Sequence, residues 1–167
     1  MGTFSSTGEF DVMGNIMSLR HGDNFRGVTS ISDDYQFYRL FASTKINSAE
    51  NLVLPATSLT PSCYRGMFIG SYIKIAPKIL PATTLTSYCY MDMFSISSIV
   101  SAPELPATTL AEHCYDYMFG ESLITIAPEL PATTLVNYCY QDMFRLSGVT
   151  YVKCLATNIS ATDCLKN

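Results

Sequence analysis

The feature that most constrains this chain is a hexapeptide that returns at nearly constant intervals. Leu-Pro-Ala-Thr-Thr-Leu begins at Leu80, Leu105 and Leu130, a close copy begins at Leu54, and a decayed copy begins at Leu155. The leading leucines are 26, 25, 25 and 25 residues apart. A unit of this length cannot bury its own apolar side chains and has to stack on similar neighbours. The repeat therefore predicts a chain of stacked coils.

Each copy continues with Cys-Tyr, two variable residues and Met-Phe. Residues four apart share one face of a helix, so this spacing predicts a short helix in every unit. Hydroxyls such as those of Thr84 and Thr109 would cap it. The four copies are Cys63-Tyr64 with Met67-Phe68, Cys89-Tyr90 with Met93-Phe94, Cys114-Tyr115 with Met118-Phe119, and Cys139-Tyr140 with Met143-Phe144.

A second local pattern separates each aromatic unit from the next hexapeptide. Residues 73–77, 99–103, 124–128 and 149–153 are rich in β-branched side chains, and three of the four stretches end at proline. This composition predicts short strands. The expected fold class is α/β, a solenoid with one short parallel strand and one short helix in each coil of about 25 residues.

The framework Ala-Pro-Glu-Leu-Pro-Ala-Thr-Thr-Leu, followed by Cys-Tyr and Met-Phe, resembles the leucine-rich-repeat proteins of gut Bacteroidales, related to the BspA-like surface-antigen repeats. The resemblance implies one right-handed leucine-rich-repeat-like solenoid domain over residues 1–167. Residues 1–50 would form an N-terminal cap and a first degenerate coil, residues 51–150 the repeats, and residues 151–167 a C-terminal coil, either complete or truncated.

Composition excludes several classes of partner and setting. The chain has 167 residues, with 10 Lys and Arg against 14 Asp and Glu, and its net charge of −4 argues against nucleic acid. Apolar runs are too short for a transmembrane segment. No signal peptide is visible at the start, so we expect a cytosolic protein, a virion protein or a piece of a longer precursor.

The six cysteines are expected to be mostly free thiols. Four share one predicted helical register, and helices pack about 8 to 10 Å apart, whereas a disulfide needs Cα atoms within about 7 Å. A disulfide between Cys154 and Cys164 stays open as an alternative. The four in register are Cys63, Cys89, Cys114 and Cys139.

The other titratable residues predict no catalytic or metal site. His113 replaces a tyrosine of the repeat, and His21 precedes Gly22-Asp23, which is typical of a turn. The aspartates at variable positions are expected on a solvated convex surface, and Asp33-Asp34 is expected to cap the first aromatic unit. Phosphate-loop, nucleophile-elbow and dinucleotide motifs are absent from the sequence, so we expect no enzyme and no cofactor. The variable-position aspartates are Asp92, Asp116 and Asp142.

Variation among the copies indicates where a ligand would bind. The framework repeats almost letter for letter, while the predicted strand surfaces differ, as in a scaffold that carries a recognition surface. Free drift of surface residues is the competing explanation. The candidate ligand-binding residues are Lys74, Ile75, Val100, Ser101, Thr125, Ile126, Thr150 and Tyr151.

The resulting functional hypothesis is a non-enzymatic binding or adhesion module with a protein or glycan ligand. The resemblance implies the bacterial cell surface or the extracellular space. The alternative is a receptor-binding or decoration protein of a phage or mobile element, carried in a virion.

Overall fold

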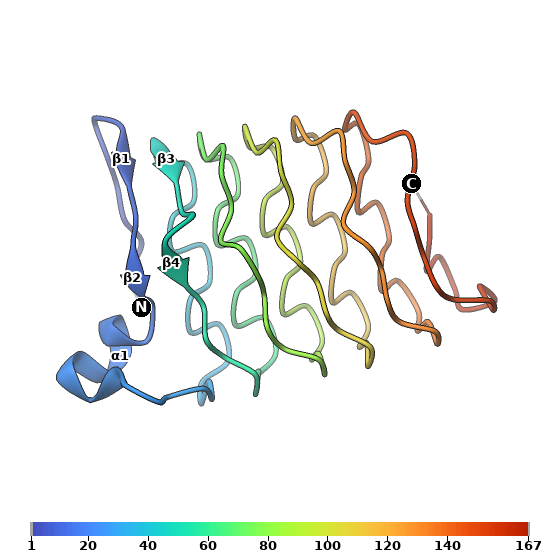
Figure 1. Cartoon of the computed structure of the whole chain (residues 1–167), viewed down its shortest axis with the longest axis horizontal. Helices are drawn as coiled ribbons and strands as arrows, with labels where there is room; N and C mark the ends of the chain where they lie inside the picture. Colours follow the sequence, from blue (N-terminus) through green and yellow to red (C-terminus); the bar gives the residue numbers. More distant parts are fainter. Residues whose placement is uncertain (1, 167) are drawn as a thin grey trace.

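The computed structural model describes residues 2–166, which wind into successive segments lying side by side along the long axis (Figure 1). Regular secondary structure is confined to the N-terminal third. Its elements are β1 (Phe10–Asp11), β2 (Gly14–Asn15), α1 (Ser18–His21), the 3-10 helix η1 (Gly22–Phe25), β3 (Ile46–Ser48) and β4 (Leu52–Val53).

The predicted fold class, an α/β leucine-rich-repeat-like solenoid with a helix and a strand in each coil, is wrong. The structure has one α-helix of four residues and two pairs of short parallel strands, β1 with β3 and β2 with β4. Within the described residues, every named helix and strand ends before Leu54. The repeats themselves are therefore built from other backbone conformations.

Runs of four-residue turns replace the predicted helices. They cover residues 61–70, 87–96, 112–121 and 137–146. In the first run the N–H of Met67 donates to the Tyr64 carbonyl at 3.1 Å, three residues earlier. An α-helix would bond to the fourth preceding residue. Four-residue turns also bring residues i and i+4 to one side, so the spacing of Cys, Tyr, Met and Phe fits both structures.

Alternate backbone N–H groups in these runs bond to the next segment instead. Tyr64 donates to the Cys89 carbonyl at 3.0 Å, and Phe68 donates to the Met93 carbonyl at 2.9 Å. A helix would consume these groups within one segment. Since buried backbone groups need partners, this division satisfies each run locally and ties it to its neighbour.

The turns require a left-handed backbone at every fourth residue. Gly66 and Gly70 have φ of 59° and 64°, and in later runs the equivalent residues carry side chains, among them Asp92 and Leu146 with φ of 57° and 55°. Residues other than glycine adopt this conformation at a cost of roughly 1 kcal/mol. The cost is tolerated because hydrogen bonds on both sides hold the run in place.

The other layer consists of extended stretches, which lie in front of the turns in Figure 1. The strands predicted at 73–77 and 99–103 shrink to single parallel bridges at Ile75 and Ser101, and those at 124–128 and 149–153 contain no bridge. Proline lacks an N–H to donate to a ladder, which explains the short pairing. We name these stretches A (46–60), B (72–86), C (98–111), D (123–136) and E (148–161).

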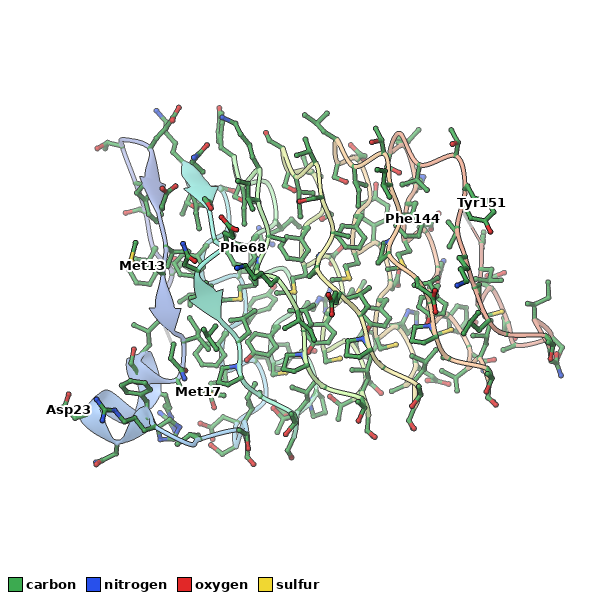
Figure 2. All side chains as sticks on the ribbon, in the orientation of Figure 1. Met13, Met17, Asp23, Phe68, Phe144 and Tyr151 are labelled. Carbon is green, nitrogen blue, oxygen red and sulfur yellow. The ribbon has the colours of Figure 1, made fainter. Side chains whose placement is uncertain are left out.

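The core between the two layers is a pair of aromatic columns. Phe94 stacks on Phe68 at 5.3 Å and on Phe119 at 5.7 Å, with ring planes within 3° of parallel. Tyr90 stacks in the same way on Tyr64 and Tyr115. Figure 2 shows Phe68 and Phe144 inside the stack. Each ring is thus buried by its equivalents in the neighbouring repeats.

Replacing Phe119 by alanine is expected to lower the free energy of unfolding by about 3 to 5 kcal/mol, because the ring is fully buried between two others. Denaturant titration followed by circular dichroism measures this loss. Leu123→Ala, at an exposed position four residues later, is the control and should change stability by less than about 0.5 kcal/mol. Equal stability of the two variants would contradict the stacked core.

Replacing Leu146 by glycine is expected to stabilise the fold by up to about 1 kcal/mol, since the side chain is exposed and its backbone is left-handed. The matched control is Leu123→Gly, at a residue that is also exposed but has no positive φ, and this variant should lose about 0.5 to 1 kcal/mol. Thermal melts of both variants test the sign. Destabilisation of both would show that the turn geometry at Leu146 is misassigned.

Candidate binding surface

The eight predicted ligand-binding residues all lie exposed on the layer of extended stretches. They occupy equivalent positions in stretches B to E, so two columns of side chains cross the face. Among the four apolar members, Ile126 and Tyr151 are the most exposed, with 77% and 75% of their surface accessible. Tyr151 lies near the C-terminal end of the stack (Figure 2).

Backbone pairing holds only the first half of these columns together. Ile75 forms parallel bridges with Ser48 and Ser101, and the N–H of Val100 donates to the Lys74 carbonyl at 3.2 Å. Within residues 2–166 no bridge reaches Ile126 or Tyr151. The structure therefore brings Ile75 and Ser101 into register by hydrogen bonding, and the later members share only the face.

Beyond Ala49 and Ile75, the extended stretches are hydrogen-bonded in twos. Stretch A pairs with the N-terminal segment, for example through Thr57 to the Thr29 carbonyl, and B pairs with C through Leu80 to the Glu104 carbonyl. D pairs with E through Leu130 to the Lys153 carbonyl. Among the described residues, no backbone hydrogen bond joins C to D, and those joining A to B stop at Ala49. Sequence reasoning predicted one short parallel strand in each coil and missed this alternation.

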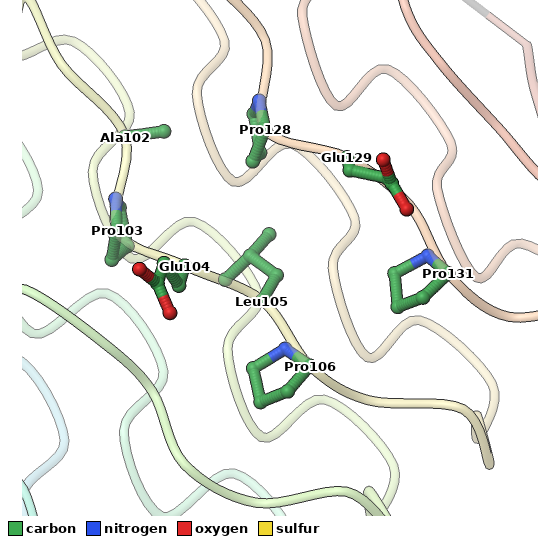
Figure 3. Close-up of a pocket in the computed structure, with 8 residues that line it drawn as sticks. All are labelled: Ala102, Pro103, Glu104, Leu105, Pro106, Pro128, Glu129 and Pro131. Atoms are coloured by element: carbon green, nitrogen blue, oxygen red, sulfur yellow. The ribbon is translucent and has the colours of Figure 1, made fainter.

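A hollow opens at each of the two interruptions. The hollow between C and D measures about 360 Å³, and Figure 3 shows four prolines with Glu104 and Glu129 around it. The one between A and B measures about 490 Å³ and is lined by residues 50–55 with Lys78, Ile79 and Pro81. The motif Ala-Pro-Glu-Leu-Pro, present at 102–106 and 127–131, is the sequence signal for the first hollow. The prolines are Pro103, Pro106, Pro128 and Pro131.

The charged groups beside the hollows differ in how they are paired. Lys153 Nζ donates to Glu129 Oε2 at 2.5 Å, and this contact raises the pKa of Lys153. Lys78 Nζ lies 3.9 Å from Glu50 Oε1. The carboxylate of Glu104 is exposed and has no hydrogen bond or ion pair within the described residues. One acidic group is therefore free at the hollow between C and D.

The turn side carries a second cluster of titratable groups. The His113 ring is stacked between Tyr88 and Tyr138 at 4.8 and 4.7 Å, and its Nδ1 lies 2.8 Å from Asp116 Oδ2. Burial raises the pKa of Asp116, with His113 opposing the shift. Asp116 was expected on a solvated surface and is instead buried, in contact with His113.

The other polar residues considered in the sequence analysis pair with neighbouring side chains or lie in turns and helix ends. Burial also raises the pKa of Asp92, whose Oδ2 lies 3.8 Å from Arg65 Nε. Asp142 is half-buried in the fourth turn run. Asp33 accepts a hydrogen bond from Arg20 at 2.6 Å and caps no helix, and His21 is the last residue of α1. In the described part of the chain, no group of three potential ligands could hold a metal ion.

The cysteine side chains continue the stacking of the core. Cys63, Cys89, Cys114 and Cys139 are buried at equivalent positions, and Cys164 extends the series. Cys114 Sγ donates to the Cys139 carbonyl at 3.7 Å. All six thiols are free, including that of half-buried Cys154. Their positions are those of small core side chains.

The buried thiols are expected to resist alkylation at pH 8. Burial raises the pKa of Cys114 to about 12, so almost no thiolate is present, and the reagent cannot reach the sulfur. Iodoacetamide labelling followed by peptide mass spectrometry should modify Cys114 only after denaturation, whereas half-buried Cys154 should react in the folded protein. Equal native labelling of Cys114 and Cys154 would contradict the buried column.

Comparison with models of protein families, with curated proteins and with solved structures finds no match. The resemblance to the Bacteroidales repeat proteins thus remains an interpretation of the sequence. Within residues 2–166, no helix has the length and apolar character that a bilayer crossing needs.

Proposed function

We propose that this chain is a non-enzymatic binding module that recognises another protein through the face of its extended stretches. The observation that supports this most directly is the concentration of exposed large apolar side chains on that face. Such clusters are rare on proteins without partners. They are Val53, Tyr72, Ile75, Ile79, Val100, Leu123, Ile126, Tyr151, Leu155 and Ile159.

The construction of the molecule favours binding over catalysis. The backbone of the face is supported from behind by the stacked core. Pre-organised groups lose little conformational entropy on binding. Tyrosine is enriched among residues that dominate interface energies, and Tyr151 offers a nearly free ring. A glycan ligand is the other possibility within this function, and the bacterial surface is the setting that the resemblance suggests.

The double variant Ile126→Asp with Tyr151→Ala tests the proposal. Screens of immobilised proteins and glycans first identify a ligand for the unmodified chain. We expect the double variant to bind this ligand at least about tenfold more weakly, since a buried charge and a lost aromatic contact each cost more than about 1 kcal/mol. Its circular dichroism spectrum and melting temperature should be unchanged, because both positions are exposed.

The matched control lies on the turn side. Ile96→Asp with Gln141→Ala changes an exposed isoleucine and a half-buried polar residue away from the proposed face. This variant should bind as the unmodified chain does. If the turn-side variant loses binding and the other keeps it, the recognition face has been assigned to the wrong layer.

A further inference from the structure

The hollow between stretches C and D combines three features that a peptide ligand would use. Its walls are rigid and apolar, because the four prolines and Leu105 line it. The two stretches that border it share no backbone hydrogen bond among the described residues, so backbone groups between them lack protein partners. Its rim carries the free carboxylate of Glu104. Each feature limits the kind of ligand that would fit the hollow.

The interrupted ladder leaves hydrogen-bond donors at the hollow. Glu104 uses its own N–H and carbonyl toward stretch B, bonding to Lys78 and Leu80. At the gap, the N–H group of Leu105 in stretch C and that of Glu129 in stretch D make no hydrogen bond within the described residues. Unpaired donors at a sheet-like edge are suited to the carbonyl oxygens of an added extended segment.

The charge pattern selects a cationic side chain. Glu129 is already neutralised by Lys153 at 2.5 Å, and the lysine nearest in register to Glu104, Lys78, is directed toward Glu50. Glu104 is therefore the carboxylate at this hollow that lacks a cationic partner, and a positive group on a ligand would supply one. Long basic side chains also lay their methylene stems on apolar surface, which the prolines supply.

Arginine fits this environment better than lysine. A planar guanidinium offers several donors in fixed directions, is weakly hydrated and stacks on flat surfaces. A volume of about 360 Å³ accommodates one such side chain rather than a folded domain. Exposed Val100 and Ile126 lie just before the two proline motifs and would contact the apolar residues that flank the arginine.

We propose that the hollow between stretches C and D binds an extended peptide segment of a partner protein, with an arginine side chain between the prolines and its guanidinium on Glu104. This inference rests on the proposed function and specifies the partner of the same face. It adds a charge requirement that the apolar face alone would not impose.

The test uses the whole chain, immobilised, and three pools of acetylated, amidated heptapeptides. The flanking positions are equal mixtures of Leu, Val, Ala, Ser and Thr, and the central residue is arginine, citrulline or glutamate. Citrulline has nearly the shape of arginine and no charge. We expect about tenfold more retention of the arginine pool than of the citrulline pool, and least of the glutamate pool. Added salt should reduce the difference.

Variants assign any preference to the hollow. Glu104→Gln should bring retention of the arginine pool down to that of the citrulline pool, while Glu112→Gln, which neutralises an exposed carboxylate on the turn side, should leave the preference intact. Circular dichroism should be unchanged for both. Equal retention of the arginine and citrulline pools, or a preference that survives Glu104→Gln, overturns the proposal.

The two proposals can fail separately. If peptides bind without regard to charge and the Ile126→Asp, Tyr151→Ala variant loses them, the face binds protein and the arginine assignment is wrong. If no pool is retained and only glycans bind the chain, the peptide ligand is refuted at this hollow. Retention that survives the double variant would contradict the proposed face itself.

Discussion

The structure depends on the way backbone N–H groups in the turn runs alternate between two kinds of hydrogen-bond acceptor, one in the same run and one in the next. Every second group closes a turn within its own run, as in Met67 to Tyr64, and the groups between them bond to the next run, as in Tyr64 to Cys89. This scheme brings consecutive repeats close enough for their rings to stack at 5.3 to 5.8 Å. The buried columns in turn exclude water from the bonds that align them.

The extended layer has fewer backbone hydrogen bonds between neighbouring segments than the turn layer. Prolines at 77, 103 and 128 remove donors at equivalent positions, which keeps the pairing between stretches short. Beyond Ala49, pairing in twos leaves open edges between A and B and between C and D, at the two hollows. Each repeat thus combines a turn run that is hydrogen-bonded to its neighbours with an extended stretch whose backbone is only partly paired.

The sequence predicted the stacking of equivalent residues but not the backbone that achieves it. Cys, Tyr, Met and Phe recur with a spacing of four, which a helix and a chain of four-residue turns place on one side equally well. Gly66 and Gly70, four apart, were the signal for turns, and it fades in later copies, where Asp92 and Leu146 hold the same conformation. Sequence reasoning did not single out Glu104, because the proposed role of its carboxylate depends on the absence of backbone hydrogen bonds between stretches C and D, which no local sequence pattern encodes.

Pairing in twos has a consequence for how such a chain could change its length during evolution. Duplication of a single repeat would shift the parity of every stretch beyond it, so an open edge would become paired or a paired edge would open. Duplication of two repeats would preserve the alternation and add one further hollow of the same kind. Copy number in steps of two would therefore increase the number of hollows and leave those already present unchanged.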